Sequence, residues 1–341
     1  MLTDADPFGH QGSDTFTSAM SFQADLKAMT AFEIALVQAQ AQRGEISQKA
    51  ALHIADVVAS TRLDTKALAD GYARDGVVVP ALVAAWRTAL LDQHKDAFHK
   101  GATSQDLVDT SLMIRAKVLV AAWDQALGEI AHVLSTIMAD HGLKQVMART
   151  RMQDAMAMPL TLRVQNWHVA VTQLRSAQPQ VFPVQMGGPD GTGRSYGGDV
   201  DHLRADLADR LQLSDPQMPW HTNRAPVLDL GSWCTSVTGA LGKIGQDITI
   251  MAQNAIAEAR LEGGGTSSAM PHKNNPIAAE WMVAIARQNA GLLGTLHQAQ
   301  VAENERSGAA WTLEWLTLPA MFAATDCALH KAKSLLDQAR F

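Results

Sequence analysis

Apolar residues recur along most of this chain at alternating steps of three and four, which is the spacing of one face of an α-helix. The longest stripe covers residues 112–137, and at 1.5 Å per residue it predicts a helix of about 39 Å. A second stripe covers residues 233–255. Further helices are predicted over residues 26–42, 160–174, 276–296 and 313–336, the last with Pro319 as an expected kink.

Strand signals are almost absent from the chain. The best one is the segment 76–79, where three valines lie between a glycine and a proline. Residues 178–219 are rich in Pro, Gly and Asp, and predict two loops around a short helix at 201–211. Helices this long pack best side by side. The pattern therefore predicts an all-α fold with a small N-terminal helical domain (1–104) and a long central bundle domain (105–341).

One predicted helix is apolar on nearly every side. Its residues Trp281, Met282, Val283, Ile285 and Ala286 cover almost the whole circumference. A helix of this kind is normally buried on all sides. We therefore expect the bundle to form a homo-oligomer.

Composition narrows the function classes. The chain has 341 residues and a net charge of −6, and its basic residues are scattered, so no nucleic-acid partner is expected. The two cysteines, Cys234 and Cys327, suggest neither a disulfide framework nor a Cys-based zinc site. Neither a secretory signal nor a membrane-spanning apolar run is visible, which predicts a soluble cytoplasmic protein without membrane contact. No metal-binding motif is visible, so neither a metal nor another cofactor is expected.

The segment 262–276 holds the densest candidate chemistry. Three glycines, two serines, a His-Lys pair and two asparagines lie there between long helical segments. Most Gly/Ser-rich stretches are polar surface linkers. A linker, however, needs no cluster of His, Lys and Asn. A flexible loop with these donors can close over a ligand instead.

Four more polar clusters lie at predicted helix ends or in loops. The segment 99–106 can cap the following helix or offer N–H groups and hydroxyls to a carboxylate. The segment 148–154 can form local salt bridges. The segment 219–224 can be a polar loop anchored by a tryptophan, and in 303–315 Arg306 can pair with Glu303 or Glu305. Taken singly, no cluster distinguishes a structural role from a functional one.

Together the clusters indicate a family. The run 263–276 closely resembles the signature loop of the fumarase/aspartase superfamily, in the form found in its adenylosuccinate lyase and carboxymuconate cycloisomerase branches. The pair Thr103-Ser104 looks like the first shared region of that superfamily, and the segment 149–161 looks like the second. The resemblance runs from about residue 16 to 336. It implies a homotetramer in which different subunits contribute to each active site.

Two details favour the cycloisomerase branch. The segments 219–224 and 305–315 are similar to those of that branch, and Arg151 stands where the lyases carry a proton-transferring histidine. The alternatives are a fumarate-releasing lyase similar to adenylosuccinate lyase, and a non-catalytic helical scaffold. Since the chain stops soon after the last predicted bundle helix, the C-terminal domain of the superfamily is expected to be absent.

The resemblance also implies a reaction, in which one carboxylate of a tricarboxylated diene adds to a double bond during protocatechuate degradation by the β-ketoadipate pathway. Arginine forks, lysine and helix N-termini suit a small tricarboxylate. The resemblance assigns acid/base chemistry to Ser268, and Lys273 is the second catalytic candidate. The expected substrate-binding residues are Thr103, Ser104, Arg151, His221, Arg224, Ser267, His272, Asn275 and Arg306.

Overall fold

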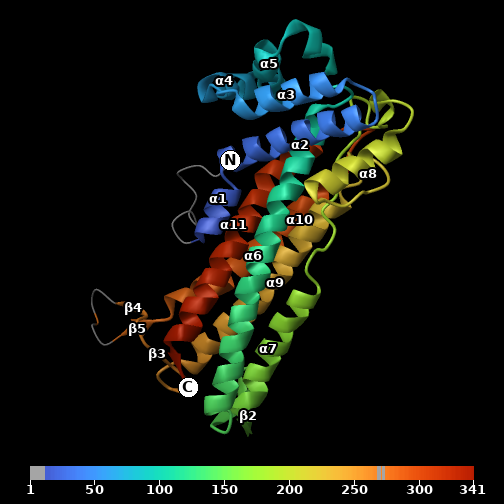
Figure 1. The fold of residues 1–341 in the computed structure, drawn as a ribbon. Coiled ribbons are helices and arrows are strands. Elements are labelled where there is room, and N and C mark those ends of the chain that lie inside the picture. Colours follow the sequence, from blue (N-terminus) through green and yellow to red (C-terminus); the bar gives the residue numbers. More distant parts are fainter. Residues whose placement is uncertain (1–11, 267–269, 271–272) are drawn as a thin grey trace.

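The computed structural model describes residues 12–266, 270 and 273–341. Long helices run side by side along the molecule, and a second group of helices covers one end of them (Figure 1). The long helices are α6 (Ser104–His141), α7 (Leu160–Ser176), α9 (Ala225–Met251), α10 (Ile277–Gln298) and α11 (Gly308–Gln338). They correspond to the helices predicted at 112–137, 160–174, 233–255, 276–296 and 313–336, and the helix predicted at 26–42 is present as well. Pro319 lies inside α11, which continues on both sides of it.

The helices at the covered end belong mainly to the N-terminal part. They are α1 (Asp14–Ala19), α2 (Phe22–Gln42), α3 (Gln48–Ser60), α4 (Thr65–Asp75), α5 (Val79–Ala89) and the 3-10 helix η1 (Asp92–Ala97). At α1 to α4 the N-cap side chain accepts a hydrogen bond from a backbone N–H of the first turn, as Ser21 and Ser47 do at α2 and α3. The predicted short helix of the Pro/Gly-rich stretch is α8 (Val200–Leu211), which packs against α2. A 3-10 turn, η2 (Arg194–Tyr196), precedes it.

The segment 76–79, which carried the best strand signal, forms no strand. Gly76 ends α4 in the left-handed conformation with φ +74°, and α5 begins at Val79. Pro80 lies in the first turn of α5, where a proline loses no helical hydrogen bond. The valines therefore lead into α5, whose first turn contains Pro80, and they pair with no other strand.

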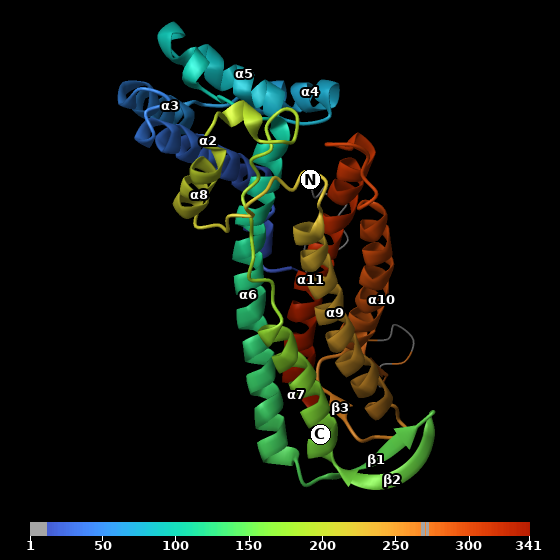
Figure 2. The same cartoon turned by 90° about the vertical axis from the view of Figure 1, so that its right-hand side faces the viewer.

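The strands of the described residues are short and lie outside the bundle core. Strands β1 (Gln145–Thr150) and β2 (Gln153–Pro159) form an antiparallel hairpin with Arg151 and Met152 at its turn. Both turn residues are left-handed, with φ +50° and +65°. The two-residue pairs are β3 (Arg260–Leu261) with β6 (Ala339–Arg340), and β4 (Gly265–Thr266) with β5 (Asn274–Asn275). Figure 2 shows the β1–β2 hairpin at the end of the bundle opposite to α3, α4 and α5.

The buried apolar residues form two clusters. One fills the bundle around Trp123, Leu241 and Phe322. The other lies under α2–α5 around Phe32 and Trp86, and it takes in residues from the start of α6, from segment 184–186 and from α8. The division at residue 104 stays a prediction.

The helix α10 is only partly covered in the single chain. Met282 and Ile285 are buried, whereas Trp281, Val283 and Ala286 are half-buried. Its remaining apolar surface is available for contacts outside this chain. None of the described helices is long and apolar enough to cross a membrane.

Candidate active site

The N-terminus of α6 is the centre of the best-defined polar cluster. Thr103 is the N-cap residue in extended conformation, and its N–H donates to Asp106 Oδ2 at 3.0 Å. Ser104, the first residue of the helix, is half-buried. A helix start of this kind directs backbone N–H groups and the positive end of the helix dipole outwards. Two of the predicted carboxylate-binding residues therefore lie where an anion is favoured.

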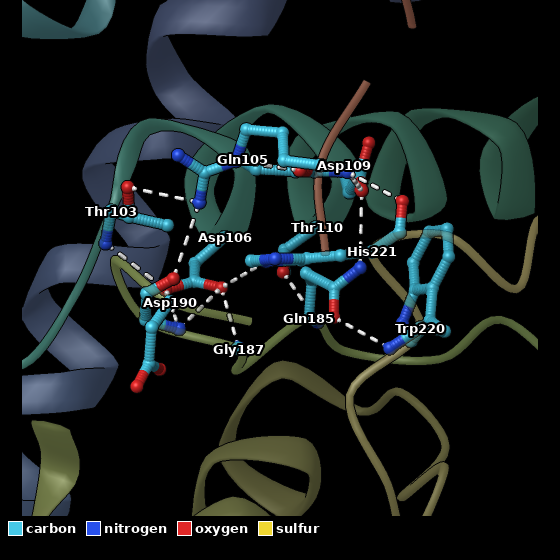
Figure 3. Close-up of polar contacts among 12 residues, drawn as sticks. Thr103, Gln105, Asp106, Asp109, Thr110, Gln185, Gly187, Asp190, Trp220 and His221 are labelled. Carbon is cyan, nitrogen blue, oxygen red and sulfur yellow. Dashed lines mark hydrogen bonds and ion pairs between the residues drawn. The ribbon is translucent and has the colours of Figure 1, made fainter. Parts of the chain in front are cut away.

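Asp106 joins three separate segments at this point. Its side chain is fully buried and accepts from the N–H of Gly187 at 2.7 Å and the N–H of Gly188 at 3.0 Å. It also accepts from the Tyr196 hydroxyl at 2.7 Å, and it lies 3.1 Å from His221 Nε2. Burial and the neighbouring carboxylate raise the pKa of Tyr196 well above its ordinary value, so the phenol stays a neutral donor. Figure 3 shows the Asp106 carboxylate between α6 and the Gly187 loop.

The loop 187–193 approaches this cluster because it is rich in glycine. A Cβ atom on Gly187 would lie 2.4 Å from the His221 ring, and Gly188 has φ +65°. Only glycine meets both conditions without strain. The sequence interpretation placed loops over 178–219 and included Asp106 in the polar segment 99–106, but it gave neither a role in the site. Four glycines within seven residues were the available signal.

Arg306 reaches the same place from the loop between α10 and α11. Its Nε donates to Gln105 Oε1 at 3.0 Å, and one terminal nitrogen lies 3.2 Å from the Gly188 carbonyl and 3.4 Å from Thr103 Oγ1. Gln105 in turn donates to the His221 carbonyl at 3.0 Å. The structure therefore brings three predicted site residues together: Thr103, His221 and Arg306.

Arg224 lies deeper, between two buried carboxylates. Its terminal nitrogens contact Asp109 at 2.7 and 3.0 Å, and its Nε and one terminal nitrogen contact Glu314 at 2.7 and 2.6 Å. The Trp220 ring lies 4.7 Å from the guanidinium carbon. The guanidinium is thus engaged along its edges by protein carboxylates and lies against an indole. In this structure Arg224 holds α6, α9 and α11 together beside the cluster.

The two carboxylates of this group differ. Burial alone would raise the pKa of Asp109, but the Arg224 charge outweighs it and the pKa is lowered. For Glu314 burial outweighs Arg224, and the pKa is raised. Asp109 also accepts from Trp311 Nε1 at 3.1 Å and from Gln185 Nε2 at 3.1 Å. Asp109 is therefore ionised, and its negative charge faces the Arg224 guanidinium.

Arg151 lies far from this cluster, in the turn of the β1–β2 hairpin. Its exposed side chain lines a cavity of about 670 Å³ together with Arg149, Arg163 and Lys243. Arg149 and Arg163 are already paired with Glu258 at 2.9 and 3.0 Å. Lys243 is paired with Asp247, which lines the same cavity, so carboxylates balance these three neighbours of Arg151.

The described parts of the signature loop, which include β4 and β5, lie beside the C-terminal half of α11 (Figure 1). Lys273 is exposed, and Asn275 is half-buried with its backbone paired to Gly265. A Cβ atom on Gly264 would lie 2.6 Å from the Asn275 carbonyl oxygen, so this loop position needs glycine. The predicted residues Ser267, Ser268 and His272 lie outside the described residues.

A single chain does not unite the three predicted regions. The Thr103 cluster lies at the start of α6 and the hairpin lies beyond its end (Figure 2). The helix has 38 residues, which at 1.5 Å each separates its ends by about 57 Å. Among the described residues, no group of three or more His, Cys, Asp or Glu side chains could hold a metal ion.

Comparison with known proteins now identifies the family. A sequence model of the family described as "Lyase" matches residues 6–291. This chain belongs to that family. The match covers more than half of the chain and includes the start of α6, the hairpin and the signature loop.

The relatives of this lyase-family chain carry more specific names. A 3-carboxy-cis,cis-muconate cycloisomerase of Pseudomonas aeruginosa is 33% identical over 330 residues, which is 94% of this chain and 72% of that protein. A nitrosuccinate lyase of Streptomyces davaonensis is 34% identical and covers 94% of this chain and 71% of that protein. The crystal structure of the 3-carboxy-cis,cis-muconate lactonizing enzyme of Pseudomonas putida gives a TM-score of 0.89 at 30% identity, with 98% of this chain and 76% of that chain covered. The predicted resemblance to the cycloisomerase branch is confirmed.

Proposed function

We propose that this protein is a 3-carboxy-cis,cis-muconate cycloisomerase of the β-ketoadipate pathway for protocatechuate. The observation that carries this proposal is the match to enzymes of that name over 94% of the chain at 33% identity. The polar cluster at the start of α6 supports it, because it combines a guanidinium, hydroxyls and a helix N-terminus. These are the groups that bind carboxylates.

The reaction requires little from the protein apart from binding, charge stabilisation and one proton. One carboxylate of the substrate forms a carbon–oxygen bond at a double bond, and negative charge moves onto a second carboxylate. A proton added to the carbon next to that carboxylate completes the lactone. Fixed donors in a site closed to water are effective at this task.

We assign the site residues to two groups. One group lies around the start of α6, and the other belongs to the signature loop and the β1–β2 hairpin. Thr103, Ser104 and Arg306 bind substrate carboxylates at the start of α6, with His221 beside them. Arg224 acts through the carboxylates that it holds. Ser268 handles the proton on carbon and Lys273 is the second catalytic residue. The other binding residues are Arg151, Ser267, His272 and Asn275.

We further propose a cytoplasmic homotetramer in which each site draws on several subunits. The separation of about 57 Å between the ends of α6 supports this, since one chain does not bring the two groups of residues together. The half-buried apolar residues of α10 support it as well, because a single chain covers them only in part. The expectation that the C-terminal domain of the superfamily is absent stays a prediction.

The proposal is tested by offering the purified protein 3-carboxy-cis,cis-muconate and following the ultraviolet absorbance of the conjugated diene. Loss of absorbance with formation of the lactone is the expected result. Nitrosuccinate is the second substrate to test, because a nitrosuccinate lyase is 34% identical to this chain. Adenylosuccinate tests the alternative lyase, which the relatives do not support. Turnover of none of the three would favour a non-catalytic scaffold.

A further inference from the structure

Both ends of the Gln105 amide are hydrogen-bonded inside the protein. The residue lies in the first turn of α6 and is only 1% exposed. Its Oε1 accepts from Arg306 Nε at 3.0 Å, and its Nε2 donates to the His221 carbonyl at 3.0 Å and to Asp109 Oδ2 at 3.2 Å (Figure 3). A buried polar side chain with all of its partners present is held rigidly.

These partners determine which way the amide of Gln105 faces. A guanidinium can only donate hydrogen bonds, whereas a backbone carbonyl and an ionised carboxylate can only accept them. The pKa of Asp109 is lowered by the Arg224 charge, so its side chain is a carboxylate. Turning the amide over would place its NH2 group against the Arg306 guanidinium and its oxygen against that carboxylate. The oxygen of Gln105 therefore faces Arg306.

Side chains of similar size at position 105 would not serve the same partners. A methionine would make none of the three hydrogen bonds. A glutamate would accept from Arg306, but it would neutralise the guanidinium and place a second anion about as close to Asp109 as the 3.2 Å that now separates Gln105 Nε2 from Asp109 Oδ2. The uncharged amide fixes the guanidinium and leaves its positive charge in place.

The protein holds the Arg306 guanidinium along one edge. This edge consists of Nε, which contacts Gln105, and Nη2, which lies 3.2 Å from the Gly188 carbonyl and 3.4 Å from Thr103 Oγ1. None of these three partners carries a charge. The other terminal nitrogen, Nη1, donates to none of the described residues, and the side chain is only half-buried. Arg306 thus keeps its charge and one free nitrogen for a ligand.

We propose that Gln105 is a positioning residue for carboxylate binding by Arg306. It fixes the Nε edge of the guanidinium against α6, and the ligand carboxylate binds at Nη1. This inference rests on the proposed function, because it takes the ligand to be a small polycarboxylate. Gln105 itself touches no ligand atom. A guanidinium that is fixed beforehand loses less side-chain freedom when the ligand binds, and the affinity is higher for that reason.

A double-mutant cycle tests this role through binding, without turnover. Calorimetry would measure the Kd of propane-1,2,3-tricarboxylate for the wild type, Gln105→Met, Arg306→Lys and the double variant. Lysine keeps the positive charge but has no Nε–H of the guanidinium for Gln105 to hold. Gln105→Met should weaken binding roughly ten-fold when Arg306 is present, and about two-fold or less in the Arg306→Lys background.

The cycle distinguishes positioning from a merely structural role. A general loosening of the first turn of α6 would weaken binding by the same factor in both backgrounds, and that result would overturn the inference. So would a Gln105→Met protein with the wild-type Kd. The matched control is Gln125→Met, which removes an exposed glutamine from the same helix. Its Kd should equal that of the wild type.

If Gln105→Met does not fold, Gln105→Asn takes its place in the cycle. Asparagine keeps an amide in the first turn of α6 but is one methylene shorter and does not reach Arg306 Nε. The same difference between the two backgrounds is expected, and equal factors would again overturn the inference. So would a wild type that does not bind the tricarboxylate. If the cycle gives the expected result but the wild type does not lactonise 3-carboxy-cis,cis-muconate, the proposed function fails and the role of Gln105 stands.

Discussion

The guanidinium Nε of Arg306 lies 3.0 Å from the side-chain oxygen of Gln105, although 201 residues separate them in the chain. The contact joins the loop before α11 to the first turn of α6. The same guanidinium reaches the Gly188 carbonyl at 3.2 Å. Arg306 thus has its position fixed by uncharged groups, and its charge is not neutralised by a carboxylate among these bonds. It is available to a substrate carboxylate.

Replacing Arg306 by Met should therefore reduce lactonisation strongly. A hydrogen bond to a charged group contributes about 1.5–3 kcal/mol, which corresponds to a loss of roughly ten- to 150-fold in kcat/KM. Arg62→Met is the matched control, because it removes the same side chain from an exposed position between α3 and α4. Steady-state rates of both variants check this. Equal rates for the two would remove Arg306 from the site.

Sites shared between subunits should show complementation. Ser268→Ala changes the signature loop and Arg306→Met changes the loop before α11, and each variant should be inactive or nearly so. After subunit exchange, some mixed sites contain neither change, and part of the activity should return. The control pair is Ser268→Ala with Lys273→Met, since both changes lie in the signature loop and no mixed site is then intact. Recovery in neither mixture, with exchange verified by mass spectrometry, would contradict shared sites.

Arg224→Met should lower the free energy of unfolding by more than the loss of an arginine from a surface ion pair does. The change leaves Asp109 and Glu314 buried without their countercharge, which typically costs about 3–5 kcal/mol. Arg194→Met is the comparison, because Arg194 forms an exposed ion pair with Asp190 and such pairs contribute about 0–1 kcal/mol. Urea unfolding monitored by circular dichroism measures both. A smaller loss for Arg224→Met than for Arg194→Met would contradict the structural role.

The pair His99–Glu33 should make stability depend on pH. Burial alone would lower the pKa of His99, but the Glu33 carboxylate 2.5 Å from Nδ1 outweighs it and the pKa is raised. A raised folded-state pKa means that the stabilisation is complete below the unfolded value of about 6.5 and is lost as the pH rises through the folded value. The difference in unfolding free energy between wild type and Glu33→Gln should therefore be larger at pH 6 than at pH 9. An equal or larger difference at pH 9 would be inconsistent with this pair.

The long helices could be predicted because each has one continuous buried face. Leu119, Trp123, Leu127, Ile130 and Leu134 are all buried along α6 at the predicted spacing. The sequence of the β1–β2 hairpin gave no such signal. The residues of β2 are mostly exposed, so buried and exposed positions do not alternate along the strand. The hairpin is held by backbone pairing and by ion pairs from Arg149, which periodicity does not record.

The candidate site was predictable to the extent that its residues lie in continuous motifs. Thr103, His221 and Arg306 come from three such motifs and meet in the structure. Asp106 was visible only as a polar residue in the first turn of a helix. Its role depends on contacts 81 to 115 residues away along the chain, which no local pattern encodes. Arg224 was predicted as a substrate group, and its two buried carboxylate partners lie 90 and 115 residues away.

The most direct measurement is a comparison of kcat/KM for 3-carboxy-cis,cis-muconate, nitrosuccinate and adenylosuccinate with the same preparation of the wild-type protein. Product identification by nuclear magnetic resonance would accompany the rates. We expect the muconate to be converted to a lactone with a kcat/KM at least 1000-fold above that for either other substrate, which corresponds to about 4 kcal/mol in transition-state binding. Efficient cleavage of nitrosuccinate or adenylosuccinate, with no lactone formed from the muconate, would contradict the proposed function.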